Sequence, residues 1–345
     1  MFSDIDLLGL RQEIMNMPEF HARQKLRGLE LSLYTFDHNY GELRNLIVLL
    51  SNDPSTEPLM YQRNRDQLHA VLREILRLLH NFVAATMSLV EHTRNLYKEM
   101  YRPRGLFRDY QDRVKRDFAH DPLCQFVQDL RNFLLHYRVP QISFSVHIEH
   151  ADANKLQEHR LVCLLKDDLR GWNGWTALAK KYLHDTVEEI SLLDVIEGYR
   201  SRVIQFYQWF LARHLEIDAQ DIERLEEKER VLFLAWLVED IKFWYAQRDQ
   251  GLPADKNEVF IQIFRSNEFA ELDKTPPDSD ARASRAIELL QEHFDVPEEI
   301  RDMIVRLYRE PVVSEPLRQE PRDACSHSEP EPQQDSRTTG PETKS

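Results

Sequence analysis

One predicted helix carries the residues whose types and spacing are suited to chemistry. It extends from Asp121 to Arg138 and reads DPLCQFVQDLRNFLLHYR. At 100° per residue, its apolar side chains gather on one face and polar side chains line a flank of that face. The apolar face consists of Leu123, Phe126, Val127, Leu130, Phe133, Leu134 and Tyr137. The polar flank consists of Gln125, Asp129, Asn132 and His136. A histidine among polar neighbours is a candidate for acid–base chemistry.

The string from Arg131 to Tyr137, RNFLLHY, resembles the signature of the HEPN superfamily. These are small helical-bundle domains of toxins and antiviral nucleases, and their motif is an arginine, a polar residue and a histidine a few residues later. The resemblance implies metal-independent cleavage of RNA, without a cofactor. It implies that His136 transfers a proton at the ribose 2′-hydroxyl or the leaving oxygen and that Arg131 holds the phosphate, while Asn132 orients His136. Asp129 and Tyr137 are the expected supporting residues.

The same resemblance implies partners. HEPN sites form across a homodimer, so a second copy of the chain is expected, together with RNA as substrate. A toxin or phage-defence context implies an antitoxin or another regulatory protein as a further partner. A β-hairpin directly after the motif departs from the all-helical family pattern, and this departure bears on the geometry of such a dimer.

An ordinary structural interpretation of these residues also stays open. The bare spacing recurs elsewhere in the chain, for example between Arg322 and His327. In this interpretation Arg131 pairs with an acid, and His136 bonds Asp129 or a neighbouring helix. The protein is then a non-enzymatic scaffold or interaction protein, and a nucleotide-binding regulator is a third alternative.

A basic segment precedes the motif helix and offers a surface for RNA. Residues 102–138 carry eight bases and five acids, a local charge of +3 in a chain with a formal net charge of -14. The nucleic-acid-binding candidates are Arg104, Arg108, Arg113 and Arg116. Aromatic residues stand among them, and stacking rings beside arginines are typical of single-strand binding. The alternative is a solvated helix with pairs such as Asp109–Arg113 and Asp112–Arg116.

The elements that must position these residues are mostly helices. Periodic apolar segments predict helices in the first fifty residues, where Gly41 interrupts the pattern, and near Tyr308. Further helices are expected at 59–101, 106–118, 190–214, 229–248 and 259–269. Apolar and polar residues alternate from Ile142 to Ile148, and a second apolar run follows at 160–165, which predicts an antiparallel β-hairpin at about 141–166. The expected fold class is mainly α, a helical bundle with this hairpin inserted.

Composition divides the chain into four parts. These are N-terminal helices at 1–50, a helical core with the motif and the hairpin at 59–215, C-terminal helices packing on that core at 216–310, and a disordered acidic tail at 311–345. The tail is rich in Pro, Glu and Ser and poor in large apolar residues, so it cannot form a core of its own.

Composition also excludes several classes of protein. The three cysteines form no CxxC pair, which argues against a disulfide framework or a structural zinc site and favours a reducing compartment. The net charge excludes binding of nucleic acid or membrane through the overall field. No apolar run has the length of a membrane span or of a signal peptide. The expected location is therefore the cytoplasm, without a membrane partner.

Overall fold

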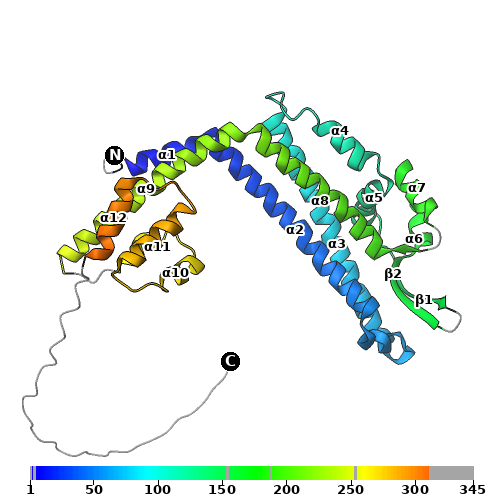
Figure 1. The fold of residues 1–345 in the computed structure, drawn as a ribbon. Helices are drawn as coiled ribbons and strands as arrows, with labels where there is room; N and C mark the ends of the chain where they lie inside the picture. The colour runs from blue at the N-terminus through cyan, green and yellow to red at the C-terminus, as the bar shows by residue number, and fades with distance from the viewer. Residues whose placement is uncertain (1, 3–4, 153–154, 187–188, 252–254, 311–345) are drawn as a thin grey trace, which may run out of the picture. The chain divides into compact units, whose positions relative to one another are not determined.

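The computed structural model describes residues 2, 5–152, 155–186, 189–251 and 255–310. The described residues form two compact units, the bundle unit (described residues within 5–233) and the C-terminal unit (residue 2 and described residues within 234–310). The mainly α class with one inserted hairpin is confirmed (Figure 1). The predicted tail lies outside the described residues. The division between the units falls inside helix α9 (Ala219–Asp249), whereas the sequence boundary at 215/216 falls inside helix α8 (Leu192–Ile217).

Long helices form the frame of the bundle unit. Their bounds are α1 Leu7–Asn16, α2 Pro18–Asn52, α3 Arg65–Leu96, α5 Pro122–His136 and α8 Leu192–Ile217. Helices α2, α3 and α8 lie side by side along much of their length (Figure 1). Their buried aromatic rings meet at the centre, where the ring centroid of Phe82 lies 5.4 Å from Phe36 and 6.2 Å from Tyr199.

Local sequence explains where these helices start and why one continues. The side chain of Asp121 accepts a hydrogen bond from the backbone of Cys124, and Pro122 is the first residue of α5, as predicted. The expected interruption at Gly41 is wrong, because α2 continues through it. Buried Phe36 and Leu43 on either side pack in the core, and this packing outweighs the weak helix propensity of one glycine.

Two predicted helices in this unit are shorter than expected. The predicted helix at 59–101 is divided into several elements. Two 3₁₀ turns, Pro54–Met60 and Gln62–Asn64, precede α3, and a π-helical turn at Tyr97–Tyr101 follows it. The predicted basic helix at 106–118 is wrong at its start, since α4 covers only Tyr110–Val114 and a π-helical turn follows at Lys115–Ala119. Phe107 has a φ of 57° and is buried, with its ring centroid 5.0 Å from that of Phe210. Burial of this ring therefore overrides helical geometry at Phe107.

The inserted sheet is larger than the predicted hairpin. Strands β1 (Ile142–Asp152) and β2 (Lys155–Leu164) pair antiparallel with Ile142 opposite Leu164, and a short strand β3 (Ile190–Ser191) adds to β2. Two short helices follow β2, α6 (Lys166–Arg170) and α7 (Ala177–Asp185). The expected half-buried face ends early, because Val146 is 40% exposed and Ile148 is 64% exposed.

The C-terminal unit has its own core. It contains the end of α9, a 3₁₀ turn at Lys256–Phe260, and helices α10 (Ser266–Leu272), α11 (Asp280–Gln291) and α12 (Glu298–Arg309). The predicted helix at 259–269 is wrong as one element, because Glu268 caps a new helix by accepting from the backbone of Arg265. The two closing helices near Tyr308 are confirmed, and Ile300, Ile304 and Tyr308 are buried in this core.

Candidate functional site

The motif residues lie in the second half of helix α5. Nη1 of Arg131 donates a weak hydrogen bond of 3.3 Å to Oδ1 of Asn132. Its Nε is buried without an acceptor, and within the described residues Arg131 has no acidic partner. His136 is the last residue of α5 and is exposed. It has no hydrogen-bond partner in the described part of the chain, so Asn132 does not hold it here.

Among the described residues, few arginines have a buried Nε without an acceptor. Nε of Arg23 is the other buried side-chain nitrogen without a partner among the described residues. However, the remaining nitrogens of Arg23 form an ion pair with Glu229. Arg131 forms no such ion pair within the described residues. A partly buried cation without an anion is an energetic cost that an anionic ligand removes.

Asp129 does not lie against the motif histidine. Its side chain is 4% exposed, and its Oδ2 accepts a 2.7 Å hydrogen bond from the backbone nitrogen of Thr176. Thr176 is the N-cap residue of α7, and its own hydroxyl accepts from Ala179. The carboxylate therefore lies at the positive end of α7 and fixes that helix on α5.

Tyr137 follows the last residue of α5 and is not part of the core face. It is 48% exposed, and its ring centroid lies 5.2 Å from that of Phe133 and 6.3 Å from that of Trp172. The guanidinium of Arg138 lies over the Tyr137 ring and pairs with Asp168 at 2.6 Å. Tyr137 thus belongs to an aromatic cluster with Phe133 and Trp172, and in the described residues no hydrogen bond joins it to His136.

The four arginines predicted to bind nucleic acid are engaged within the chain. Arg113 and Arg116 both pair with Asp117, at 2.5 and 2.8 Å. Arg108 donates to the backbone oxygen of Gly105, and Arg104 pairs with Asp218 and Asp221. In place of the expected partners Asp109 and Asp112, both Arg113 and Arg116 pair with Asp117, and Asp109 lies 3.6 Å from Arg213 instead. Paired arginines are less available to RNA phosphates than free ones.

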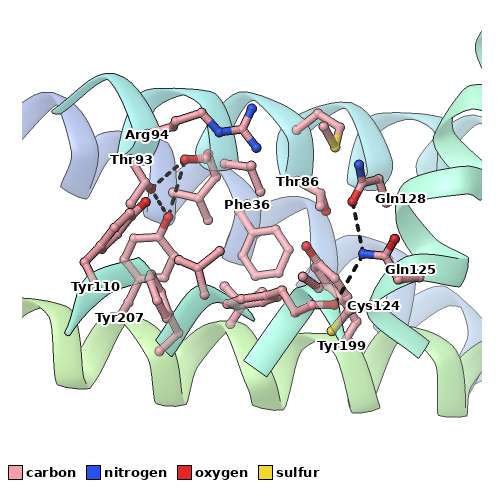
Figure 2. A pocket seen from close by; sticks show the side chains of 18 residues that line it. Phe36, Thr86, Thr93, Arg94, Tyr110, Cys124, Gln125, Gln128, Tyr199 and Tyr207 are labelled. Atoms are coloured by element: carbon pink, nitrogen blue, oxygen red, sulfur yellow. Dashed lines mark hydrogen bonds between the residues drawn. The ribbon is translucent and has the colours of Figure 1, made fainter. Parts of the chain in front are cut away.

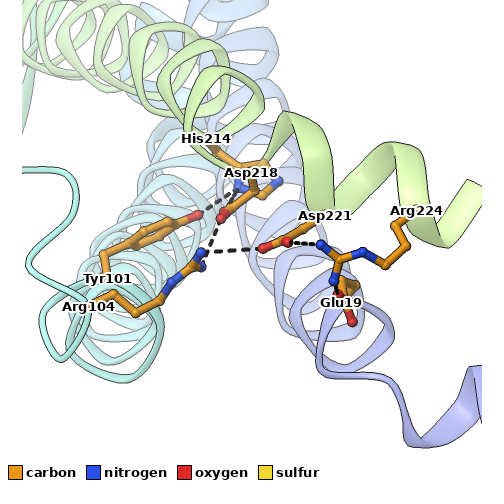
Figure 3. Close-up of polar contacts among 7 residues, drawn as sticks. All are labelled: Glu19, Tyr101, Arg104, His214, Asp218, Asp221 and Arg224. Carbon is orange, nitrogen blue, oxygen red and sulfur yellow. Dashed lines mark hydrogen bonds and ion pairs between the residues drawn. The ribbon is translucent and has the colours of Figure 1, made fainter.

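A buried polar network that the sequence did not reveal lies where α8 ends and α9 begins (Figure 3). Nδ1 of His214 lies 2.7 Å from the hydroxyl of Tyr101 and 3.0 Å from Oδ2 of Asp218. Arg104 donates to Oδ1 of Asp218 at 2.9 Å and also reaches Asp221. Burial alone would raise the pKa of the Asp218 carboxyl, but the hydrogen bonds from His214 and Arg104 outweigh it, so this pKa lies below its ordinary value.

A cavity of about 570 Å³ adjoins this network. His214 and Asp218 line it together with aliphatic side chains such as Leu26 and Leu211. A histidine oriented by a carboxylate is a common acid–base pair, but the side chains that line the cavity include no serine, threonine or cysteine that it could activate. The network is better explained as the element that fixes the α8–α9 junction. The spacing of His214 and Asp218 on one helix face is the only sequence signal for it, because Tyr101 and Arg104 come from a distant segment.

The described residues contain neither a group of metal-ligating side chains nor a helix that could cross a membrane. No group of three or more His, Cys, Asp or Glu side chains there is arranged to hold a metal ion. No helix among them is both long and apolar enough to cross a bilayer. Comparisons with protein-family models, with curated proteins and with solved structures found no match.

Proposed function

We propose that this protein is a HEPN-like, metal-independent ribonuclease whose site contains Arg131, Asn132 and His136. The observation that carries the proposal is the state of Arg131, a partly buried guanidinium without an acidic partner in the described residues, on the helix that ends at exposed His136. An RNA phosphate would supply the missing anion, and arginine binds phosphate through paired hydrogen bonds.

The chemistry assigned to these residues is proton transfer around a held phosphate. The ribose 2′-oxygen attacks the adjacent phosphorus, the bond to the leaving 5′-oxygen breaks, and a 2′,3′-cyclic phosphate forms. His136 takes the proton from the 2′-hydroxyl or gives one to the leaving oxygen. Arg131 stabilises the charge that builds on the phosphate oxygens. Asn132 orients the ring of His136 once substrate or a second copy of the chain is bound.

A homodimer supplies the second proton-transfer group in this proposal. One chain offers one His136, and the reaction needs a base on one side of the phosphate and an acid on the other. The proposed biological context is toxin or phage-defence activity in the cytoplasm, with an antitoxin or another regulator as partner. Cys124 and Cys163 are both free and buried, which suits a reducing compartment.

The test is cleavage of total RNA in EDTA by purified wild type and His136→Ala. We expect wild type to cleave, and loss of the histidine to slow cleavage about 10²–10⁴-fold. Arg131→Lys is expected to lose about 10²-fold, because lysine keeps the charge but not the paired geometry. The matched control is His184→Ala, since His184 is also an exposed histidine near a helix end and has only a weak contact with Asp185. Cleavage by neither wild type nor variant, or equally by both, would refute the proposal.

The rival function is a helical interaction protein without enzymatic activity. The pairing of Arg104, Arg113 and Arg116 with acids favours it, because these three predicted phosphate contacts are already engaged within the chain. Growth on expression separates the two: a nuclease slows the host and His136→Ala relieves the effect, whereas an interaction protein behaves alike in both forms.

A further inference from the structure

A cavity inside the bundle unit has polar groups that the protein leaves unused. It measures about 160 Å³ and is lined by residues of α2, α3, α5, α8 and the segment 110–119. Figure 2 shows Gln125 and Gln128 at one end, Thr93, Tyr110 and Tyr207 at the other, and Phe36 between them. The walls between these ends are apolar and include Val114, Phe118, Val203 and Phe206. The cavity thus has apolar walls and hydrogen-bonding groups at its two ends.

Two tyrosine hydroxyls that face this cavity have no partner among the described residues. Tyr110 is 5% exposed and Tyr199 is 4% exposed, and both line the cavity. Tyr207, on the same wall, differs because its hydroxyl bonds Thr93 and approaches the backbone oxygen of Leu89. Neither oxygen is among the fully buried side-chain atoms that lack a hydrogen-bond partner, so both hydroxyls are reachable from the cavity and can bond water or a ligand there.

The protonation of these hydroxyls makes them donors at neutral pH. Burial raises the pKa of Tyr110 to about 12 and raises that of Tyr199 well above its ordinary value. Both therefore present an O–H group to whatever occupies the cavity. Arg94 also lines it, but Arg94 is paired with Glu91 at 2.5 Å, so no free charge faces the space. A charged occupant would lose its hydration without compensation.

We propose that this cavity binds a neutral, single-ring aromatic molecule that carries a hydrogen-bonding oxygen, with Tyr110 or Tyr199 as the donor. The size supports one ring, since an engineered cavity of about 150 Å³ in another protein accommodates benzene. The aromatic walls favour a flat apolar body, and the free hydroxyls favour an acceptor on it. This site is separate from Arg131 and His136, so the proposal does not depend on nuclease activity.

The experiment measures binding of two fluorinated probes to the full chain by ¹⁹F NMR. The probes are 4-fluorophenol and fluorobenzene, which share the ring and differ by one hydroxyl. We expect 4-fluorophenol to bind wild type about five- to tenfold more tightly, the effect of about one hydrogen bond. One of the two substitutions Tyr110→Phe and Tyr199→Phe should remove most of that preference, and both should leave the affinity for fluorobenzene within about twofold. Tyr137→Phe, outside the cavity, is the control that should change neither.

Two further results decide the proposal. Val203→Phe fills the cavity, so it should abolish binding of both probes while an unchanged thermal melt shows that the variant is folded. Failure of wild type to bind either probe would overturn the proposal and assign the two hydroxyls to ordered water. Equal affinity for both probes, unaffected by the Tyr→Phe substitutions, would also overturn it, because the cavity would then be a purely apolar void.

Discussion

At the scale of single residues, the Asp218 carboxylate offers a sharp test of what the buried network contributes. It is 5% exposed and holds both His214 and Arg104. Asp218→Asn keeps the shape but removes the charge, so we expect the free energy of unfolding of the bundle unit to fall by about 2–4 kcal/mol. Urea unfolding measures this change.

Asp221→Asn is the matched control for that substitution. Asp221 accepts from the same Arg104, but its side chain is 31% exposed and the distance is 3.3 Å. Exposed pairs of this kind contribute about 0–1 kcal/mol. If both variants lost the same small amount, the network would have no special role at the α8–α9 junction.

The lowered pKa of the Asp218 carboxyl predicts how the stability of the protein changes with pH. This pKa is lower in the folded protein than in the unfolded chain, where an aspartate titrates at ~3.9. The stabilisation is therefore complete above that value and is lost as the pH falls through the lower, folded pKa. Between about pH 5 and pH 3, wild type should lose stability more steeply than Asp218→Asn. Urea melts at several pH values test this, and parallel slopes would contradict it.

At the scale of elements, Asp129 shows how a residue of the motif helix can serve another helix. Its carboxylate is bonded to the first turn of α7 through Thr176. Asp129→Ala should destabilise the protein by about 1–3 kcal/mol, because it leaves a backbone N–H unpaired. The control is Asp112→Ala, an exposed aspartate on α4, which should stay within about 0.5 kcal/mol of wild type. Thermal and urea unfolding report both, and equal stability of the two variants would refute this role for Asp129.

Helix α5 also shows how far the sequence predicts a site. Its capping by Asp121 and its buried face follow from local signals, and both are confirmed by the structure. The placement at 100° per residue put Tyr137 on the buried face. However, α5 ends at His136, so this periodicity no longer applies, and Tyr137 lies at the surface. The same placement put Asp129 on the polar flank, and the partner that buries this carboxylate lies 47 residues further along the chain. Contacts of that range leave no periodic trace in the sequence.

The other polar sites could not be predicted from the sequence for the same reason. Tyr101 and His214 are 113 residues apart, and Tyr110 and Tyr199 come from different helices. Each of these residues is unremarkable in its own segment, where an apolar or aromatic pattern predicts only burial. Their function as a network or as cavity walls appears only when α8 packs against the segments at 97–114.

At the scale of the whole molecule, the net charge of -14 constrains the proposed function. An acidic protein repels RNA at long range, so binding must depend on short-range contacts and weaken little as salt rises. We expect the affinity for a short single-stranded RNA to fall less than tenfold between 50 and 200 mM salt, about the effect of one or two phosphate contacts. Fluorescence anisotropy measures it. A much steeper dependence would indicate a wider basic surface than Arg131 provides.

The two separate cores predict that the units differ in their response to a core substitution. Ile304 is fully buried in the C-terminal core, and Ile75 of α3 is fully buried in the bundle core. Ile304→Ala removes buried methyl groups and leaves a cavity, which should destabilise its unit by about 2–5 kcal/mol. Hydrogen exchange followed by mass spectrometry should then show faster exchange across α11 and α12 and unchanged exchange in α3. Ile75→Ala is the reciprocal control and should accelerate α3 while leaving α12 protected. If either substitution accelerated exchange equally in both units, the two units would unfold as one cooperative body, and their cores would not be independently stable.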